Sequence, residues 1–278
     1  MVSKDSKVRY YTMKHEQAAV HAADGYARAT GNPGVVLLTS ASGITNGVTG
    51  IATAFSDSVP LVIIAGHLEQ DPLKKEPFQE LDISGLTIAI TKHAFKINAM
   101  NCLKDVLKKA IEIAADGRPG PILIELTTDT TVTDLPTQRH SPTKVNQTNL
   151  EKSIKIAKDL IENVRKPVLF VGGGIIASGA AHELREIVAR SRIPVVSSLL
   201  GIGSMEAGNP LYLGMLGMHG TFAANKAVHH ADLLICIGVR FSDRVTGRIS
   251  GFSPKSIKIH VDIDPAEINK IIAVDLPV

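Results

Sequence analysis

Residues 167–177 read Pro-Val-Leu-Phe-Val-Gly-Gly-Gly-Ile-Ile-Ala, and this stretch decides the fold class that the sequence predicts. A short apolar run ends at a glycine triplet, and a segment of helical spacing follows at 180–190. The spacing Gly172-x-Gly174-x-x-Ala177 is typical of a turn where backbone amides approach a dinucleotide pyrophosphate. We therefore expect a strand, a tight turn and a helix of a doubly wound α/β domain, although a turn without a ligand has the same spacing.

Apolar runs alternate with segments of helical spacing along the rest of the chain. Strands are expected at 35–39, 61–65, 122–126, 167–171, 194–198, 233–237 and 257–261, and helices at 15–29, 45–55, 102–115, 150–163, 180–190 and 223–230. We expect a Ser/Gly loop at 40–43 and irregular structure at 66–85. The pattern predicts two parallel sheets covered by helices, in domains 1–130 and 149–278, with a Thr- and Pro-rich linker at 131–148.

The first predicted helix, 15–29, carries many small side chains. Its spacing predicts one closely packed face made of Ala18, Ala19, Ala22, Ala23, Tyr26 and Ala27. Gly31 is expected to end this helix because glycine adopts the left-handed conformation readily. Glu16 lies in the first turn, where a carboxylate is favoured by the helix dipole whether or not it has a catalytic role.

The composition makes several classes of protein improbable. The chain has 278 residues, with 30 basic and 27 acidic side chains and a net charge of +3, and no Lys/Arg block suggests a nucleic-acid or membrane surface. No apolar run approaches the roughly 20 residues of a transmembrane helix, and no signal peptide opens the sequence. The two cysteines, Cys102 and Cys236, lack CxxC spacing, and no HExxH pair occurs, so we expect a cytoplasmic protein without a metal site in these residues.

Several loops are expected where the second sheet ends. They are Leu216–Thr221, Gly238–Arg244 and Asp262–Pro265. Arg240 and Arg244 could bind phosphate or carboxylate, and Asp262 could accept a hydrogen bond from a ribose hydroxyl. Together these loops favour a nucleotide cofactor. A nicotinamide site should also place a carboxylate at the end of the next strand, and the residues there are Ser197 and Ser198, which argues against a dehydrogenase.

The segment His15-Glu16-Gln17-Ala18-Ala19-Val20-His21-Ala22-Ala23-Asp24-Gly25-Tyr26-Ala27-Arg28-Ala29-Thr30-Gly31 resembles the thiamine diphosphate-dependent enzymes, and closely the catalytic subunits of acetolactate synthases. Similarity continues at Thr45-Asn46, Gly50–Ala54, Asp57–Pro60, Phe78–Glu80, Lys92-His93, Gly117–Pro121 and through the second-domain loops. It covers almost the whole chain. The resemblance implies a partial pyrimidine-binding domain followed by a Rossmann-like central domain that holds FAD.

The resemblance also implies the roles of individual residues. Glu16 would hydrogen-bond the aminopyrimidine ring of thiamine diphosphate, so that the cofactor can remove its own C2 proton. The residues implied around FAD are Arg118, Gly172, Gly173, Gly174, Leu216, Gly217, Met218, His219, Gly238, Val239, Arg240, Asp243, Arg244, Asp262 and Ile263. Those implied at the substrate entrance are Phe78, Gln79, Lys92 and Arg244, with Arg244 binding the carboxylate of the acceptor 2-oxo acid.

Members of this family condense pyruvate with a second 2-oxo acid in branched-chain amino acid biosynthesis, as homo-oligomers that can carry a regulatory subunit. Their chains begin about 30 to 40 residues earlier and continue into a third domain that binds the diphosphate and Mg²⁺ through a GDG…N motif. That motif is absent from this sequence, so we expect a truncated chain that is inactive by itself.

The sequence departs from the family at a few positions, and other functions stay open. The family loop Thr-Ser-Gly-Pro-Gly is Thr39-Ser40-Ala41-Ser42-Gly43 here, His67 replaces a glutamine, and Ser242 replaces an aspartate. One alternative is a non-catalytic FAD-binding or assembly module. Another is a different thiamine-dependent carboligase or decarboxylase.

Overall fold

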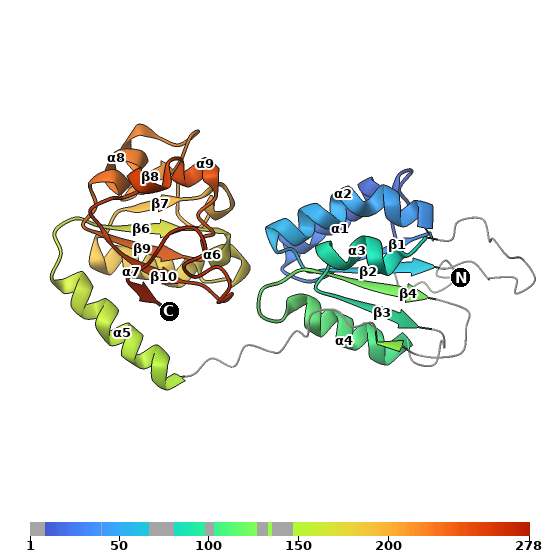
Figure 1. The fold of residues 1–278 in the computed structure, drawn as a ribbon. Helices are drawn as coiled ribbons and strands as arrows, with labels where there is room; N and C mark the ends of the chain where they lie inside the picture. The colour runs from blue at the N-terminus through green and yellow to red at the C-terminus, as the bar shows by residue number, and fades with distance from the viewer. Residues whose placement is uncertain (1–8, 40, 67–80, 98–102, 127–132, 135–146) are drawn as a thin grey trace, which may run out of the picture. The chain divides into compact units, whose positions relative to one another are not determined.

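The computed structural model describes residues 9–39, 41–66, 81–97, 103–126, 133–134 and 147–278. The chain divides into two compact units, Met1–Pro142 and Thr143–Val278. Each has one mainly parallel sheet with helices on both faces, so the predicted α/β fold class is confirmed (Figure 1). Within the described residues no helix is both long and apolar enough to span a bilayer.

The sheet of the first unit has the strand order β1-β2-β4-β3-β5. Its strands are β1 (Gly34–Leu38), β2 (Leu61–Gly66), β3 (His93–Ile97), β4 (Pro121–Leu126) and β5 (Thr133–Asp134). The pairs among β1, β2, β4 and β3 are parallel, and β5 runs antiparallel to β3 at one edge. The β2 run Leu61–Ala65 is buried throughout, as in a strand covered on both faces.

Helices cover the two faces of this sheet. They are α1 (Glu16–Thr30), α2 (Ala41–Asp57), α3 (Ile83–Thr87), the 3₁₀ turn η2 (Ile88–Ile90) and α4 (Leu103–Ala115). Figure 1 shows α1 and α2 on one face of the sheet and α4 on the other. Alternate residues of β2 enter different cores, because Leu61 and Ile63 pack with α1 and α2 while Val62 and Ile64 pack with α4. The parallel strands therefore bring their carboxyl ends to one edge.

The second sheet has the order β11-β10-β9-β6-β7-β8, with all pairs parallel. Its strands are β6 (Pro167–Val171), β7 (Val195–Ser197), β8 (Tyr212–Met215), β9 (Leu233–Ile237), β10 (Ile257–Val261) and β11 (Leu276–Pro277). Counted from β6, the order is 6-5-4-1-2-3, the Rossmann arrangement. The order reverses between β6 and β9, where such sheets place their ligands.

The helices of the second unit are mostly short. They are α5 (Gln147–Glu162), α6 (Gly173–Ala177), α7 (Ala181–Ser191), η4 (Leu199–Gly201), α8 (Phe222–His230), α9 (Asp243–Thr246) and η5 (Ile249–Gly251). One core joins Phe170 and Leu234 to Val228 of α8, and the other joins Leu169 and Val171 to Val188 of α7. Both faces of this sheet are thus buried too.

Several local expectations were wrong. The predicted loop 40–43 is helical from Ala41, since α2 begins four residues earlier than expected. Ala18, Ala22 and Tyr26 are exposed, and α1 instead buries Val20, Ala23, Asp24 and Ala27, so the predicted face was displaced around the helix. Gly31 does end α1, with a left-handed φ of 73°. Most of the proposed linker, 131–148, lies outside the described residues.

Strands without a continuous apolar run were missed. β3 reads His-Ala-Phe-Lys-Ile, and only its Ala94, Phe95 and Ile97 are fully buried. β8 contains Gly214 and is half-buried along its length. The two short edge strands, β5 and β11, have two residues each and cannot show a period.

Candidate functional site

Glu16 lies at the carboxyl edge of the first sheet, beside the loop that follows β1. His15 caps α1, accepting a hydrogen bond at Nδ1 from the Gln17 amide at 3.1 Å. The half-buried Glu16 carboxylate turns toward α2 and accepts a hydrogen bond at Oε2 from the Asn46 side-chain amide at 3.0 Å. The structure therefore places this carboxylate where parallel sheets bind their ligands.

Small residues bring α1 and α2 close enough for this contact. A Cβ built on Gly50 would lie 2.7 Å from the Val20 Cβ, and one on Gly47 would lie 3.4 Å from Val20 Cγ2. At the other end of α1, Arg28 pairs with Asp24 and reaches Asp57 on α2 at 2.8 Å. These contacts fix the two helices and thereby the distance between Glu16 and Asn46.

Gly43 packs closely against Thr39 beside the Glu16 carboxylate. A Cβ on Gly43 would lie 2.4 Å from Thr39 Oγ1 and 3.5 Å from Glu16 Oε1. Any larger residue would displace the Thr39 side chain. Glycine at position 43 therefore lets the first turn of α2 lie this close to Thr39 and Glu16.

The electrostatics keep Glu16 ionised at neutral pH. Its pKa lies below the ordinary value because its own backbone amide and then the Asn46 amide hydrogen-bond the charged form, and His15 adds a smaller effect. Partial burial opposes these effects. The carboxylate is therefore a proton acceptor in the described chain, and it becomes a donor only if a bound group covers it and raises its pKa.

Two residues predicted around the substrate and FAD lie at the opposite edge of this sheet. The Lys92 backbone amide donates to Pro121 at the start of β4, and its ammonium donates to the carbonyls of Ile113 and Asp116 at the end of α4. Arg118 Nε donates to Ser58 Oγ at 2.9 Å. In the first unit the structure does not bring Lys92 and Arg118 together with Glu16, and Phe78 and Gln79 lie outside the described residues.

Lys92 is an unusual cation. Its stem packs over Gly120, and desolvation lowers the pKa of the ammonium to about 8, with Asp116 opposing and Arg118 reinforcing the shift. Of its two carbonyl partners, Ile113 lies in the last turn of α4 and Asp116 directly follows the helix, so Lys92 caps the carboxyl end of α4. A substrate-entrance role for Lys92 stays a prediction.

The carboxyl edge of the second sheet gathers most of the other predicted residues. The segments that carry them follow β6 (Gly172, Gly173, Gly174), β8 (Leu216, Gly217, Met218, His219), β9 (Gly238, Val239, Arg240, Asp243, Arg244) and β10 (Asp262, Ile263). Met218 and Ile263 are largely exposed, at 72% and 56%, and Arg244 is exposed between them in sequence. Exposed apolar side chains beside arginines fit a cofactor that has both a flat ring and a pyrophosphate.

The glycines serve chiefly to pack loop against loop. A Cβ on Gly172 would lie 2.1 Å from the Gly238 carbonyl oxygen, and one on Gly174 would lie 2.6 Å from the Gly238 Cα. The Gly172 amide donates to Ile237, and the Gly174 amide donates to Gly238 at 3.1 Å. These two amides therefore donate within the protein, and binding of a pyrophosphate at the glycine triplet stays a prediction.

Asp262 is more enclosed than expected. Its side chain is 10% exposed, Oδ1 accepts a hydrogen bond from the Asp264 amide at 2.9 Å, and burial raises its pKa. Ser197 ends β7 and its hydroxyl lies 2.7 Å from the Tyr212 hydroxyl, so no carboxylate lies where a nicotinamide ribose would need one. This geometry argues further against a dehydrogenase.

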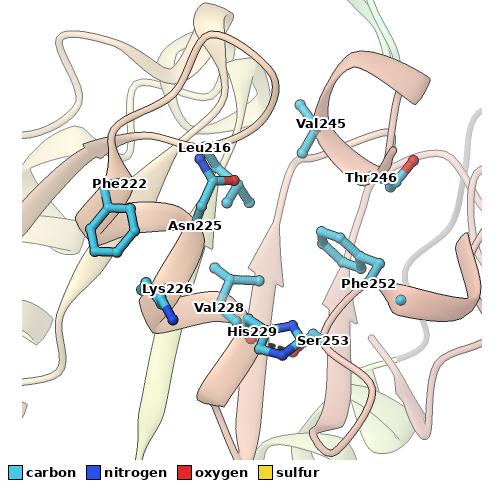
Figure 2. Close-up of a pocket in the computed structure, with 11 residues that line it drawn as sticks. Leu216, Phe222, Asn225, Lys226, Val228, His229, Val245, Thr246, Phe252 and Ser253 are labelled. Atoms are coloured by element: carbon cyan, nitrogen blue, oxygen red, sulfur yellow. Dashed lines mark hydrogen bonds between the residues drawn. The ribbon is translucent and has the colours of Figure 1, made fainter. Parts of the chain in front are cut away.

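A groove of about 380 Å³ adjoins these loops in the second unit. Figure 2 shows Phe222, Asn225 and Lys226 of α8 on one side, and Val245, Thr246 and Phe252 on the other. Leu216 and Val245 neighbour the predicted residues Gly217 and Arg244. Asn225 is hydrogen-bonded to both backbone groups of Gly217, so it holds the loop that carries Met218.

Residues that the sequence did not single out complete these sites. In the sequence, Asn46 stood out only as part of a short segment that resembles the family, and Gly43 only as part of a loop that departs from it. His260 lies inside a strand, where an alternating pattern gives no sign of a buried imidazole. Within the described ranges no group of three or more His, Cys, Asp or Glu side chains is placed to hold a metal ion.

Comparison with known proteins identifies both halves of the chain. Residues 1–86 match the N-terminal TPP binding domain of the thiamine pyrophosphate enzymes, and residues 154–278 match their central domain.

The curated relatives agree with these matches. The acetolactate synthase isozyme 3 large subunit of Escherichia coli K12 is 42% identical over 281 residues, which cover 98% of this chain and 48% of the relative. Isozyme 2 from the same organism is 42% identical over 268 residues, covering 96% and 49%. A probable acetolactate synthase large subunit of Methanocaldococcus jannaschii is 45% identical over 282 residues, covering 99% and 48%. The chain thus spans about half the length of these relatives.

Proposed function

We propose that this chain, which belongs to the thiamine pyrophosphate enzymes and is homologous over nearly its whole length to acetolactate synthase large subunits, forms the pyrimidine-binding and FAD-binding parts of an acetolactate synthase. The whole enzyme would decarboxylate pyruvate and join the two-carbon unit to a second 2-oxo acid, in branched-chain amino acid biosynthesis. The observation that carries the proposal is the Glu16 carboxylate, which Asn46 orients beside Gly43 at the start of α2.

Thiamine diphosphate, when bound, supplies a carbon nucleophile that attacks the 2-oxo acid and then stores its electrons. Glu16 would hold the aminopyrimidine ring at a ring nitrogen and exchange a proton with it. Asn46 would keep the carboxylate in one orientation, since its amide already donates to Oε2. The third part of the family's site, which would hold the diphosphate and Mg²⁺, is not formed by the described residues.

FAD is the second cofactor of this proposal. Arg240 and Arg244 would bind its phosphates, Met218 and Ile263 would contact its ring or adenine, and Gly173, Gly217, His219, Val239 and Asp243 would border it. Gly172 and Gly174 would shape the loops, since their amides already bond within the protein. Arg244 would also reach the acceptor carboxylate, while Phe78, Gln79, Lys92 and Arg118 stay predictions from resemblance.

The partners and location complete the proposal. Pyruvate and other 2-oxo acids would be substrates, and the enzyme would be a homo-oligomer that can bind a regulatory subunit. A cytoplasmic location is supported by Cys236, a free cysteine fully buried in β9.

The direct test is to purify the chain and analyse it by absorbance and mass spectrometry for bound FAD. We expect flavin bands near stoichiometric amounts after incubation with FAD and removal of the excess. Acetolactate formation is then measured after adding a separate polypeptide that carries the diphosphate-binding domain of a relative. FAD binding without any thiamine-dependent product would favour a non-catalytic FAD-binding module instead.

A further inference from the structure

His260 is a fully buried side chain in β10, beneath the loops of the proposed FAD site. Its exposed fraction is 0%, and β10 lies between β9 and β11. The imidazole Nε2 lies 2.9 Å from the Val239 carbonyl oxygen. Its ring also meets the Phe241 ring edge-on, with the centroids 5.0 Å apart. Both neighbours belong to the loop that follows β9. A residue of β10 therefore holds the loop that follows the adjacent strand.

That loop has a strained backbone. Gly238 has a φ of 60° and Phe241 a φ of 48°, so both adopt the left-handed conformation. Glycine adopts it easily, but a bulky residue such as Phe241 is strained there and needs support from its surroundings. The support is visible, because Phe241 is packed against Phe252 and His260, and His260 binds the Val239 carbonyl between the two left-handed residues.

The hydrogen bonds of His260 are incomplete. A bond to a carbonyl oxygen requires a proton on Nε2, which leaves Nδ1 as a bare acceptor in the neutral ring. Among the described residues Nδ1 is buried without a hydrogen-bond partner. Leaving such an atom unsatisfied destabilises the fold, and an apolar side chain at this position would avoid that penalty. Stability alone therefore does not account for an imidazole at position 260.

The same imidazole also lies near the carboxylate that follows its own strand, β10. Nε2 lies 3.7 Å from Asp262 Oδ2, and Oδ1 of that carboxylate already accepts the Asp264 amide. The loop that His260 holds is also bonded to the segment that follows β8, since the Arg244 carbonyl accepts a hydrogen bond from the Met218 amide at 2.8 Å. One buried ring thus connects the segments after β10, β9 and β8, which carry Asp262, Arg240 and Met218.

We propose that His260 is a positioning residue, whose Nε2–H holds the Val239 carbonyl so that loop 238–244 presents Arg240 and Arg244 to the nucleotide. This inference rests on the proposed FAD site for its ligand. The physical role of His260 can nevertheless be measured without any ligand, because the loop conformation is itself observable.

Two variants separate hydrogen bonding from packing. His260→Phe keeps a ring against Phe241 but removes the N–H donor, whereas His260→Gln can place an amide N–H near the position of Nε2. His182 provides matched controls, His182→Phe and His182→Gln, because it is 79% exposed on α7. FAD affinity is measured on the purified full chain by quenching of flavin fluorescence, and the melting temperature is measured on the same samples.

We expect His260→Phe to weaken FAD binding by about tenfold or more with a melting temperature no lower than that of the parent, and His260→Gln to restore the affinity to within about threefold. The His182 variants should match the parent. Equal FAD affinity in His260→Phe and the parent would overturn the proposal, as would a loss of affinity that only follows a loss of folded protein.

A second measurement keeps the role of His260 separate from the identity of the ligand. Amide chemical shifts of residues 239–244 and the φ-dependent coupling of Phe241 are recorded by NMR without FAD, in the parent and in His260→Phe. The proposal expects this loop to change, while the α7 amides keep their shifts. If the parent fails to bind FAD and the loop still changes, the proposed cofactor is wrong and the positioning role stands. If the loop is unchanged, the positioning role is wrong.

Discussion

The side-chain amide of Asn46 donates a hydrogen bond to Oε2 of Glu16 across 3.0 Å and so joins the first turn of α1 to α2. Residues thirty positions apart in sequence meet because α1 and α2 pack through glycine. The bond fixes one carboxylate oxygen and turns the other toward Gly43. The orientation of Glu16 therefore depends on a neighbour on another helix.

Removing this neighbour should change the acidity of Glu16. In Asn46→Ala we expect the pKa of Glu16 to rise toward its ordinary value, because one of the two main hydrogen bonds to the charged form is lost. The pKa is measured by carboxyl-carbon NMR during a pH titration. Thr45→Ala on the same exposed turn is the control, and it should leave the Glu16 titration unchanged.

The sign of the accompanying stability change follows from linkage. The folded pKa of Glu16 lies below the unfolded value, so its contribution to stability is present above about pH 4.5 and is lost as the pH falls through the folded pKa. As the pH falls through this range, the free energy of unfolding of Asn46→Ala should decrease less than that of the parent. An unchanged Glu16 titration in Asn46→Ala would show that the bond has no electrostatic effect.

The close approach of α1 and α2 predicts opposite effects for two glycines. Gly50→Ala adds a Cβ about where Val20 already lies and should destabilise the first unit by about 1–3 kcal/mol. Gly25→Ala on α1 meets nothing within 4 Å and should stabilise by about 0.5–1 kcal/mol, since alanine favours the helix. Urea unfolding followed by circular dichroism measures both, and equal effects would contradict the packing described.

Lys92 should make stability depend on pH in the alkaline range. Its folded pKa of about 8 lies below the ordinary 10.5, so between these values the unfolded chain holds a proton that the folded chain has lost. The contribution of Lys92 to the free energy of unfolding therefore rises with pH from about 8 to 10.5. Lys92→Met keeps the stem over Gly120 and should remove this rise.

The measurement is urea unfolding at several pH values, with the difference between variant and parent taken at each pH so that other titrating groups cancel. Lys104→Met, on the exposed face of α4, is the matched control and should keep the slope of the parent. If the free energy of unfolding changed with pH equally in Lys92→Met and in the parent, the Lys92 ammonium would not be desolvated.

The sequence predicts most strands of the two sheets closely. The strands β1, β2, β4, β6, β7, β9 and β10 were expected within one residue of their bounds, because short apolar runs such as Leu61–Ala65 are typical of strands in parallel sheets. β3 and β8 were missed because burial of their residues depends on partners elsewhere in the chain. The start of α2 was missed because Ala41-Ser42-Gly43 has the composition of a loop, and packing against Glu16 and Thr39 overrides that tendency.

The candidate site was predictable residue by residue only in part. Glycines that approach a phosphate and glycines that approach another backbone have the same spacing, and Gly172 and Gly174 make the second kind of contact. Asn46 and His260 act through neighbours distant in sequence, at Glu16 and Val239. Such pairs become visible only when the fold brings the elements together.

A polypeptide of these 278 residues should form no acetolactate from pyruvate, even with thiamine diphosphate, FAD and Mg²⁺ supplied. The reason is that the GDG…N motif, through which the family binds the diphosphate and Mg²⁺, does not occur in these 278 residues. A colorimetric assay for acetoin, after acid decarboxylation of any acetolactate, checks this. Clear turnover by the purified polypeptide would contradict the expectation.

The most direct test of the central claim is the exchange rate of the thiamine diphosphate C2 proton, compared in the parent and in Glu16→Gln. The chain is first combined with a polypeptide that supplies the diphosphate-binding domain, and melting temperature is measured on the same samples. Glutamine keeps the volume and a hydrogen bond but cannot exchange the proton, so we expect exchange to slow by roughly 10²–10⁴-fold while the fold persists. If Glu16 only favours the helix dipole, the variant should instead lose about 0.3–1 kcal/mol of stability. Equal exchange rates in parent and variant would contradict the proposed role of Glu16.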